Sequence, residues 1–531
     1  MSRPGERWLG ARLHPLFAGL VGLALGLASG VALAADPPAP LLTAALSEGA
    51  GEGPGDDFRR SDPEEVELAP VAESSGLSGL TAVQTRTEVL TLAEVLDAVA
   101  AADPRLVAAQ KKIDAADGEL LGARGGFDTK VAMRGLIQPL GYYQHGLVDV
   151  RVEQATPLWG LGVWSGWRLG LGEFAVYDGK LRTADAGELR AGVSLPVWQG
   201  GPIDRTRADI SQARIGQQRA GLERDAKQLE LEAKAAKAYW IWVTTGLELE
   251  IERSLLGIAL ERDGGLRRQI ELGEVEAIVG TDNRRVILAR EARVVGAERE
   301  FQAAALELSL FLRDARGEPD LAGAERLPLA FPELAPPGVV DIETEIQTAV
   351  DRRPDLAAVH AGREQAEVEL RLAKNLRSPA IDLSAWAAKD IGPGPADRLP
   401  AELVAMVEIE VPIPLRKARG QLQAARAELG QIDAKLRFAR DRVAVDVRDA
   451  HSALAAAYQR AQLAREQVDL AQTLARAELR RFELGAGDLL LVNLRELATA
   501  TAAREQVEAL ADYFVAKAQL DVAMGLQVER D

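Results

Sequence analysis

Histidine is the side chain best suited to acid–base or metal chemistry near neutral pH, and this sequence of 531 residues has four. His14 lies near the N-terminus, His145 lies in a region of expected strands, and His360 and His451 lie on expected helices. In "HAGRE", His360 and Glu364 share one helical face. That stretch is not a zinc motif, so packing on a surface or in a lumen is the better interpretation.

Other kinds of reactive site are also not indicated. The sequence has no cysteine, which excludes disulfides, thiolate metal sites and a cysteine nucleophile. "GLGVWSG" lacks the strand-to-helix context of a phosphate-binding loop, and four methionines are too few for a soft-metal relay. A net charge of −17 argues against binding to nucleic acid. We therefore expect no enzyme activity, no catalytic residues, no cofactor and no metal.

The N-terminus has the pattern of an export signal. Three arginines within the first twelve residues precede an apolar run from Leu16 to Leu27, and Ala32-Leu33-Ala34 offers a small-residue cleavage site. A retained membrane anchor is the alternative. Residues 1–34 are thus predicted to be a signal peptide, and 35–88, rich in Pro, Gly, Ser and acids, a flexible extension. No later run reaches 18 apolar residues, so a membrane-resident chain would have to use strands.

A duplication organises the rest of the chain. The helix that begins at Thr91, with Glu94 three residues later as in a capping box, has a second copy about 250 residues on, in which Asp103-Pro104 matches Arg353-Pro354. We predict a first repeat at 89–313, a connector at 314–341, a second repeat at 342–526 and a short tail at 527–531.

Each repeat changes from helical to strand periodicity and back. Glycines and alternating runs such as "GLVDVRVEQ" and "LRAGVSLPV" predict a β-hairpin region at 127–198, and a shorter hairpin is expected at 380–413. Aromatic residues are scarce elsewhere, so their concentration here indicates a membrane girdle, although the core of a soluble sheet is the alternative. The predicted girdle residues are Tyr142, Tyr143, Trp159, Trp164, Trp167, Tyr177 and Trp386.

Two long tracts without proline predict two very long helices. None occurs between Pro202 and Pro319 or after Pro414, and both tracts are rich in strong helix formers. Gly273 and Gly485, each in "ELG", are expected to end these helices and to mark the tips of two helical hairpins. The returning helices are shorter, and the first helix of each repeat has the length to make up the difference. Gly264-Gly265 is a candidate for a local break.

With these features the sequence resembles the TolC-like outer membrane efflux protein family over Thr91 to Leu526. The matching pieces are "ADPRLVAAQ" and "RRPDLAAVH", "SLPVWQGG" and "EVPIPLRKARG", and the tips "IELGEVEAIVGTDNRRV" and "FELGAGDLLLVNLRE". The resemblance implies a mainly α fold with transmembrane β: a homotrimer with a 12-stranded β-barrel, four strands per subunit, continuous with a long periplasmic α-helical barrel. It also implies the outer membrane of a Gram-negative bacterium, and a passive exit duct that partners with a periplasmic adaptor protein and an inner-membrane pump.

The second tip departs from the family pattern. A gap-free match from Gly485 places the acidic constriction residues of the best-known member on Leu491 and Leu494, and its latch tyrosine on Phe482. The resemblance therefore favours an apolar plug over an acidic ring, and the alternative is that Leu489 to Leu491 pack between neighbouring hairpins. The charged residues nearby are Asp488, Arg495 and Glu496.

Two other classes of protein also contain long helices. A periplasmic adaptor has long hairpins with exposed tips, but normally one hairpin within soluble β-domains. A fibrous coiled-coil scaffold would have no use for the β-region at 127–198. The paired hairpins and the aromatic strands favour the duct.

Overall fold

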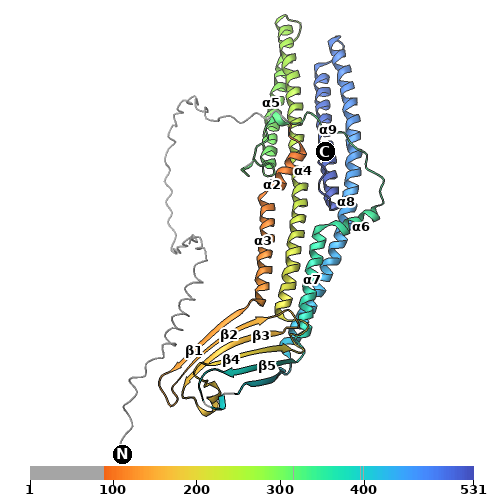
Figure 1. Ribbon diagram of the computed structural model, residues 1–531. Coiled ribbons are helices and arrows are strands. Elements are labelled where there is room, and N and C mark those ends of the chain that lie inside the picture. Colours follow the sequence, from red (N-terminus) through yellow and green to blue (C-terminus); the bar gives the residue numbers. More distant parts are fainter. Residues whose placement is uncertain (1–88, 315, 395, 399, 531) are drawn as a thin grey trace, which may run out of the picture. The chain divides into compact units, whose positions relative to one another are not determined.

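The computed structural model describes residues 89–530, except 315, 395 and 399 (Figure 1). The predicted signal peptide and N-terminal extension therefore lie outside the described residues. The described part consists of eight α-helices, four short 3₁₀ helices and one sheet. None of its helices is long and apolar enough to cross a membrane.

Each repeat begins with a helix that a proline divides. In the first, α2 (Leu92–Ala102) is followed by α3 (Pro104–Arg124), and in the second α6 (Ile342–Arg352) is followed by α7 (Pro354–Asn375). Proline is tolerated at the first helical position because that N–H has no helical partner. Thr91 caps α2 as expected, since its hydroxyl accepts a hydrogen bond from the Glu94 N–H at 3.2 Å.

The two long helices form without interruption. α4 (Arg205–Glu271) has 67 residues and α8 (Arg416–Glu483) has 68. The break expected at Gly264-Gly265 is wrong: α4 continues through both glycines, whose cost of about 1 kcal/mol each is carried by strong helix formers around them.

A left-handed glycine ends each long helix. Gly273 and Gly485 have φ of 76° and 73°, and the N–H of the next residue bonds back to the carbonyl of Gln269 or Arg481 at 2.9 Å. This is the Schellman geometry that glycine favours. The chain then returns as α5 (Ala277–Leu308) or α9 (Leu489–Ala523).

Interrupted helices flank the continuous ones. α3 and α5 both pack against α4, while α7 and α9 both pack against α8. α4 also contacts α7 and α9, which joins the two repeats side by side (Figure 1).

The sheet has six antiparallel strands in sequence order, from β1 to β6. The expected four strands per subunit is therefore wrong: residues 127–198 contain two hairpins, not one. Glycine and tryptophan dominate "GVWSGWRLGLG", which obscured one of the extra strands. The strands are β1 (Lys130–Gln138), β2 (His145–Ala155), β3 (Gly162–Gly172), β4 (Glu188–Pro196), β5 (Ala380–Asp390) and β6 (Glu402–Glu410).

Short 3₁₀ helices lie next to or between these strands and in the connector. They are η1 (Gly125–Phe127), η2 (Val176–Leu181), η3 (Ala324–Arg326) and η4 (Ala396–Arg398).

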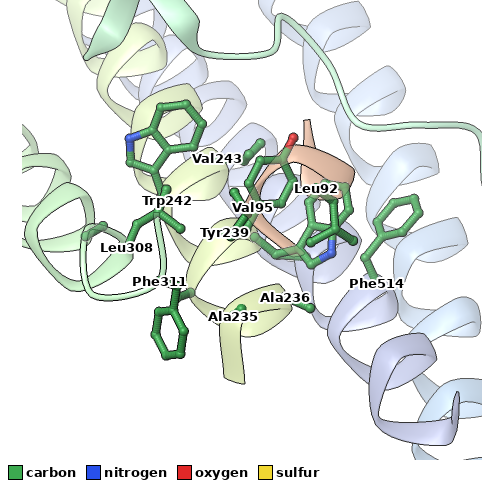
Figure 2. Close-up of a cluster of buried hydrophobic side chains, with 14 of the residues drawn as sticks. Leu92, Val95, Ala235, Ala236, Tyr239, Trp242, Val243, Leu308, Phe311 and Phe514 are labelled. Carbon is green, nitrogen blue, oxygen red and sulfur yellow. The ribbon is translucent and has the colours of Figure 1, made fainter. Parts of the chain in front are cut away.

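The main apolar core lies where α2, the middle of α4, the ends of α5 and α9, and the connector meet (Figure 2). Trp240 stacks on Phe514 and Phe331, with ring centroids 4.5 and 5.4 Å apart. The buried Tyr239 hydroxyl donates to the Leu90 carbonyl at 3.0 Å. Aromatic packing in this core thus ties the start of the first repeat to the end of the second.

Candidate functional site

One face of the sheet is almost free of charge. Successive side chains of a strand point to opposite faces, so the pairing register assigns every paired residue to one of two faces. Among the paired positions, the apolar face has a single charged residue. This is Lys389, near the end of β5 that lies away from the helices. The larger members of this face are Val131, Met133, Ile137, Val148, Val150, Val152, Val163, Trp167, Leu169, Leu171, Leu189, Val193, Leu195, Ile381, Leu383, Leu403, Val407 and Ile409.

The opposite, polar face has a lattice of ion pairs. Arg168 pairs with Glu188 at 2.7 Å, and Arg190 with Asp149 at 2.6 Å. A third pair joins Arg151 to Glu153 at 2.6 Å. A face with such pairs belongs against water, while the apolar face belongs against hydrocarbon.

Strand length also suits a membrane. The strands have 9 to 11 residues, which is about the length that a tilted strand needs to cross a bilayer. Alternation between an apolar and a polar face over such strands is the pattern of transmembrane β-barrels.

The predicted girdle residues divide into three groups. Tyr142, Tyr143 and Tyr177 lie beyond the strand ends far from the helices, and Trp159 lies in the turn at the helix end. Trp167 is on the apolar face. Trp164 and Trp386 are on the polar face, with ring centroids 6.5 Å apart, and the Arg151 guanidinium lies 4.2 Å from the Trp164 ring centroid.

The three histidines that the structure describes have ordinary partners. His145 packs on Phe174, with ring centroids 4.5 Å apart; His360 lies 3.3 Å from Arg440; and His451 pairs with Glu345. In the part of the chain that the structure describes, no cluster of three or more His, Asp or Glu residues could hold a metal ion.

At the second tip, the predicted gate residues differ in exposure. Leu491 and Leu494 are 41% and 51% exposed on α9, Phe482 is half-buried, and Arg495 is exposed. Asp488 is the N-cap of α9, because its Oδ1 accepts a hydrogen bond from the Leu490 N–H at 2.9 Å. At the first tip, Gly273 is exposed.

Glu496 joins the two hairpins. Its carboxylate pairs with Arg290 of α5 at 2.9 Å and with Arg262 of α4. Asn493 accepts from Arg262 at 2.9 Å, and the Arg290 guanidinium also donates to the Leu255 carbonyl at 2.7 Å. The sequence marked Glu496 as a nearby charge but missed both arginines, since residues more than 200 positions apart share no local pattern. The cluster borders a groove of about 1030 Å³ between α4, α8 and α9.

A second contact between the hairpins is acidic. Burial and the neighbouring Glu508 carboxylate of α9 raise the pKa of Glu248 of α4 to about 7. Arg504 opposes this shift, and Glu300 adds to it. This contact is therefore sensitive to pH in the neutral range.

Known proteins share both the sequence pattern and the fold. The sequence profile of the family "Outer membrane efflux protein" matches residues 346–526. CusC, a transmembrane channel, shares 14% identity at a TM-score of 0.60, over 82% of this chain and 92% of that one.

Two further channels give similar values. The Neisseria gonorrhoeae outer membrane channel MtrE shares 17% identity at a TM-score of 0.58, over 83% of this chain and 90% of that one. The Vibrio cholerae outer membrane protein VceC shares 17% identity at a TM-score of 0.58, over 82% of this chain and 97% of that one. No curated protein sequence matches the chain.

The second repeat thus matches the outer membrane efflux protein family over residues 346–526, and the described chain has the fold of solved outer membrane channels. The predicted fold class is confirmed in outline, and the solved structures that share it include outer membrane channels. The matched profile is that of efflux proteins, and the periplasmic adaptor is not favoured. The family consists of channels, not enzymes.

Proposed function

We propose that this efflux protein forms a homotrimeric, passive exit duct. The strands of its copies close into one barrel across the outer membrane, and the helices continue it through the periplasm. The observation that carries the proposal is the sheet: one face nearly without charge, the other with ion pairs, on strands of 9 to 11 residues. In this arrangement the apolar face contacts lipid and the polar face lines the lumen. Catalytic residues and a cofactor have no role in such a duct.

The predicted domains form part of this proposal. Residues 1–34 act as the signal peptide, and each repeat, 89–313 and 342–526, supplies a helical hairpin and part of the sheet. The girdle consists of aromatic residues at the two strand ends and on the apolar face, namely Tyr142, Tyr143, Trp159, Trp167 and Tyr177. Trp164 and Trp386 belong to the lumen side in this proposal.

The two tips are proposed to meet a periplasmic adaptor protein, which links the duct to an inner-membrane pump. Inserting a proline after Gly273 or Gly485 should disrupt the start of the returning helix and abolish efflux, while the trimer still assembles. Transport that persists with both tips altered would place docking elsewhere on the helices.

The second tip is proposed to be the gate. Leu491 and Leu494 of three copies converge into an apolar constriction, which hydrated ions enter poorly. Asp488→Asn should reduce cation preference with little effect on closure, because asparagine can also cap α9. A large rise in resting conductance of that variant would contradict the apolar gate.

Membrane fractionation and electrophoresis test the duct as a whole. The chain should appear in the outer-membrane fraction and migrate as an oligomer that dissociates only on heating. In planar bilayers, the Leu491→Ser variant should give discrete conductance steps. A periplasmic adaptor would be released in the soluble fraction and would give no steps.

A further inference from the structure

A hollow lies on the apolar face of the sheet, toward the strand ends that point away from the helices. Its volume is about 440 Å³, within the range of roughly 300–1,000 Å³ that ligand pockets have. Three short side chains form one row across it, because Ser165 pairs with Ala191 and Ala191 with Ala387. Larger apolar side chains at neighbouring positions border this row, namely Val150, Val152 and Leu189.

Lys389 lines the same hollow. It is the single charged residue among the paired positions of the apolar face, and its side chain is exposed. None of the paired positions of that face holds an acidic residue, and no ion pair to Lys389 occurs within the described residues. An anion that neutralises Lys389 therefore has to come from outside this face.

The position of Lys389 corresponds to the edge of a membrane. It is the last residue but one of β5, at the end away from the helices. Its row across the sheet contains Leu189 and then Trp167, and the Trp167 indole N–H donates to the Ala186 carbonyl in the loop beyond the strands at 2.9 Å. Tryptophan is typical of the headgroup level of a bilayer. Because the helices extend into the periplasm in the proposed duct, this level belongs to the outer leaflet.

We propose that the hollow binds a phosphorylated lipid of the outer leaflet, with the Lys389 ammonium on its phosphate and one acyl chain along the short side chains. The proposal rests on the proposed outer-membrane duct and adds a lipid site to its outer surface.

The order of the two contacts along β5 fits such a lipid. Ala387 is two residues closer to the helices than Lys389, on the same face of the strand. An acyl chain that extends from a headgroup at Lys389 toward the bilayer centre therefore passes over the row of short side chains.

The two contacts contribute in different ways. Lipid tails are as apolar as the side chains that they touch, so an acyl chain gains only the close packing that the shape of the hollow allows. The charge supplies the selectivity. A lysine ammonium has three donors and no acceptor, and charge-assisted hydrogen bonds to phosphate are among the stronger ones.

Lipid binding to the oligomer purified from outer membranes tests the site. The probe is lipid A, a phosphorylated glycolipid with several acyl chains, and native mass spectrometry reports the number bound. Lys389→Gln should bind lipid A roughly tenfold more weakly, because a hydrogen bond to a charged group is lost. Ala387→Phe should also weaken binding, because the larger side chain fills the hollow.

Two matched controls separate the site from the rest of the surface. Lys180→Gln removes an exposed lysine of η2, outside the sheet, and Ala385→Phe enlarges a side chain of the same face that does not line the hollow. Both should bind lipid A as the natural chain does. None of the four variants places a new charge on the lipid-facing surface, so all should assemble.

Dephosphorylated lipid A should bind the natural chain as weakly as lipid A binds the Lys389→Gln variant, and inorganic phosphate should not displace lipid A. Undiminished binding by either Lys389→Gln or Ala387→Phe would overturn the site, and displacement by inorganic phosphate would overturn the role of the acyl chain. An outer-membrane oligomer that binds no lipid A overturns this inference alone. A chain that never reaches the outer membrane contradicts the proposed duct.

Discussion

Glu496→Gln should loosen the attachment between the two hairpins near the tip. The glutamate lies between two arginines, and the side chains of Glu496, Arg262 and Arg290 are only 12%, 15% and 5% exposed. Glutamine keeps the size of the side chain and removes its charge. The two guanidinium groups then face each other without a carboxylate between them.

The magnitude follows from the burial of the cluster. Removing one partner of a buried pair costs about 3–5 kcal/mol, since it leaves an uncompensated charge. The lower end applies here, because the cluster borders an open groove. About 3 kcal/mol corresponds to a shift of roughly a hundredfold in the equilibrium between attached and separated hairpins.

Two measurements on the purified protein report that shift. The variant should show a higher open probability in planar bilayers and faster cleavage by chymotrypsin near the tip. Arg495→Gln is the matched control, because Arg495 is the exposed neighbour of Glu496 on α9 and should change neither reading. If Glu496→Gln behaves like the control in both assays, the cluster does not hold the hairpins together.

Three further predictions address the membrane, pH and the gate. Val150→Lys on the apolar face should cost about 2–4 kcal/mol in lipid and block outer-membrane assembly, whereas Ser384→Lys on the polar face should assemble; equal yields of heat-dissociable oligomer would be inconsistent with the assigned faces. The raised pKa of Glu248 means that the folded protein holds a proton that the unfolded chain releases, so its contribution to stability should decline as the pH rises from about 4.5 through 7. Glu248→Gln should flatten this dependence in thermal unfolding at pH 6 and pH 8, and an unchanged slope would refute the assignment. Leu491→Ser should raise resting conductance strongly, and a variant that stays closed would show that the constriction lies elsewhere.

The helical part of the fold was predictable because its signals are local. The cap at Thr91, the prolines that start α3 and α7, and the left-handed glycines after α4 and α8 all act within a few residues. The lengths of the two long helices followed from the absence of proline. The break predicted at Gly264-Gly265 was wrong because helix propensity is summed over many residues. The strong helix formers around the two glycines outweigh their unfavourable contribution, and α4 continues through them.

The strand count was not predictable in the same way. β2 and β4 show clear alternation, whereas β3 has four glycines among its eleven residues, and glycine weakens the signal of a strand. This segment is a strand because it pairs with β2 on one side and with β4 on the other.

Contacts between distant segments were also missed. Arg262 and Arg290 are unremarkable in sequence, and their importance comes from Glu496, which the fold brings to them.

The central claim, that the sheet crosses the outer membrane with one face in lipid and the other in a lumen, is tested most directly by cysteine accessibility along β2. Single cysteines at positions 148 to 153 should be labelled in outer-membrane vesicles with a small, water-soluble maleimide. Cysteines that replace Asp149, Arg151 and Glu153 should react, and those that replace Val148, Val150 and Val152 should be protected. Equal reactivity on both faces, or protection of both, would contradict the account.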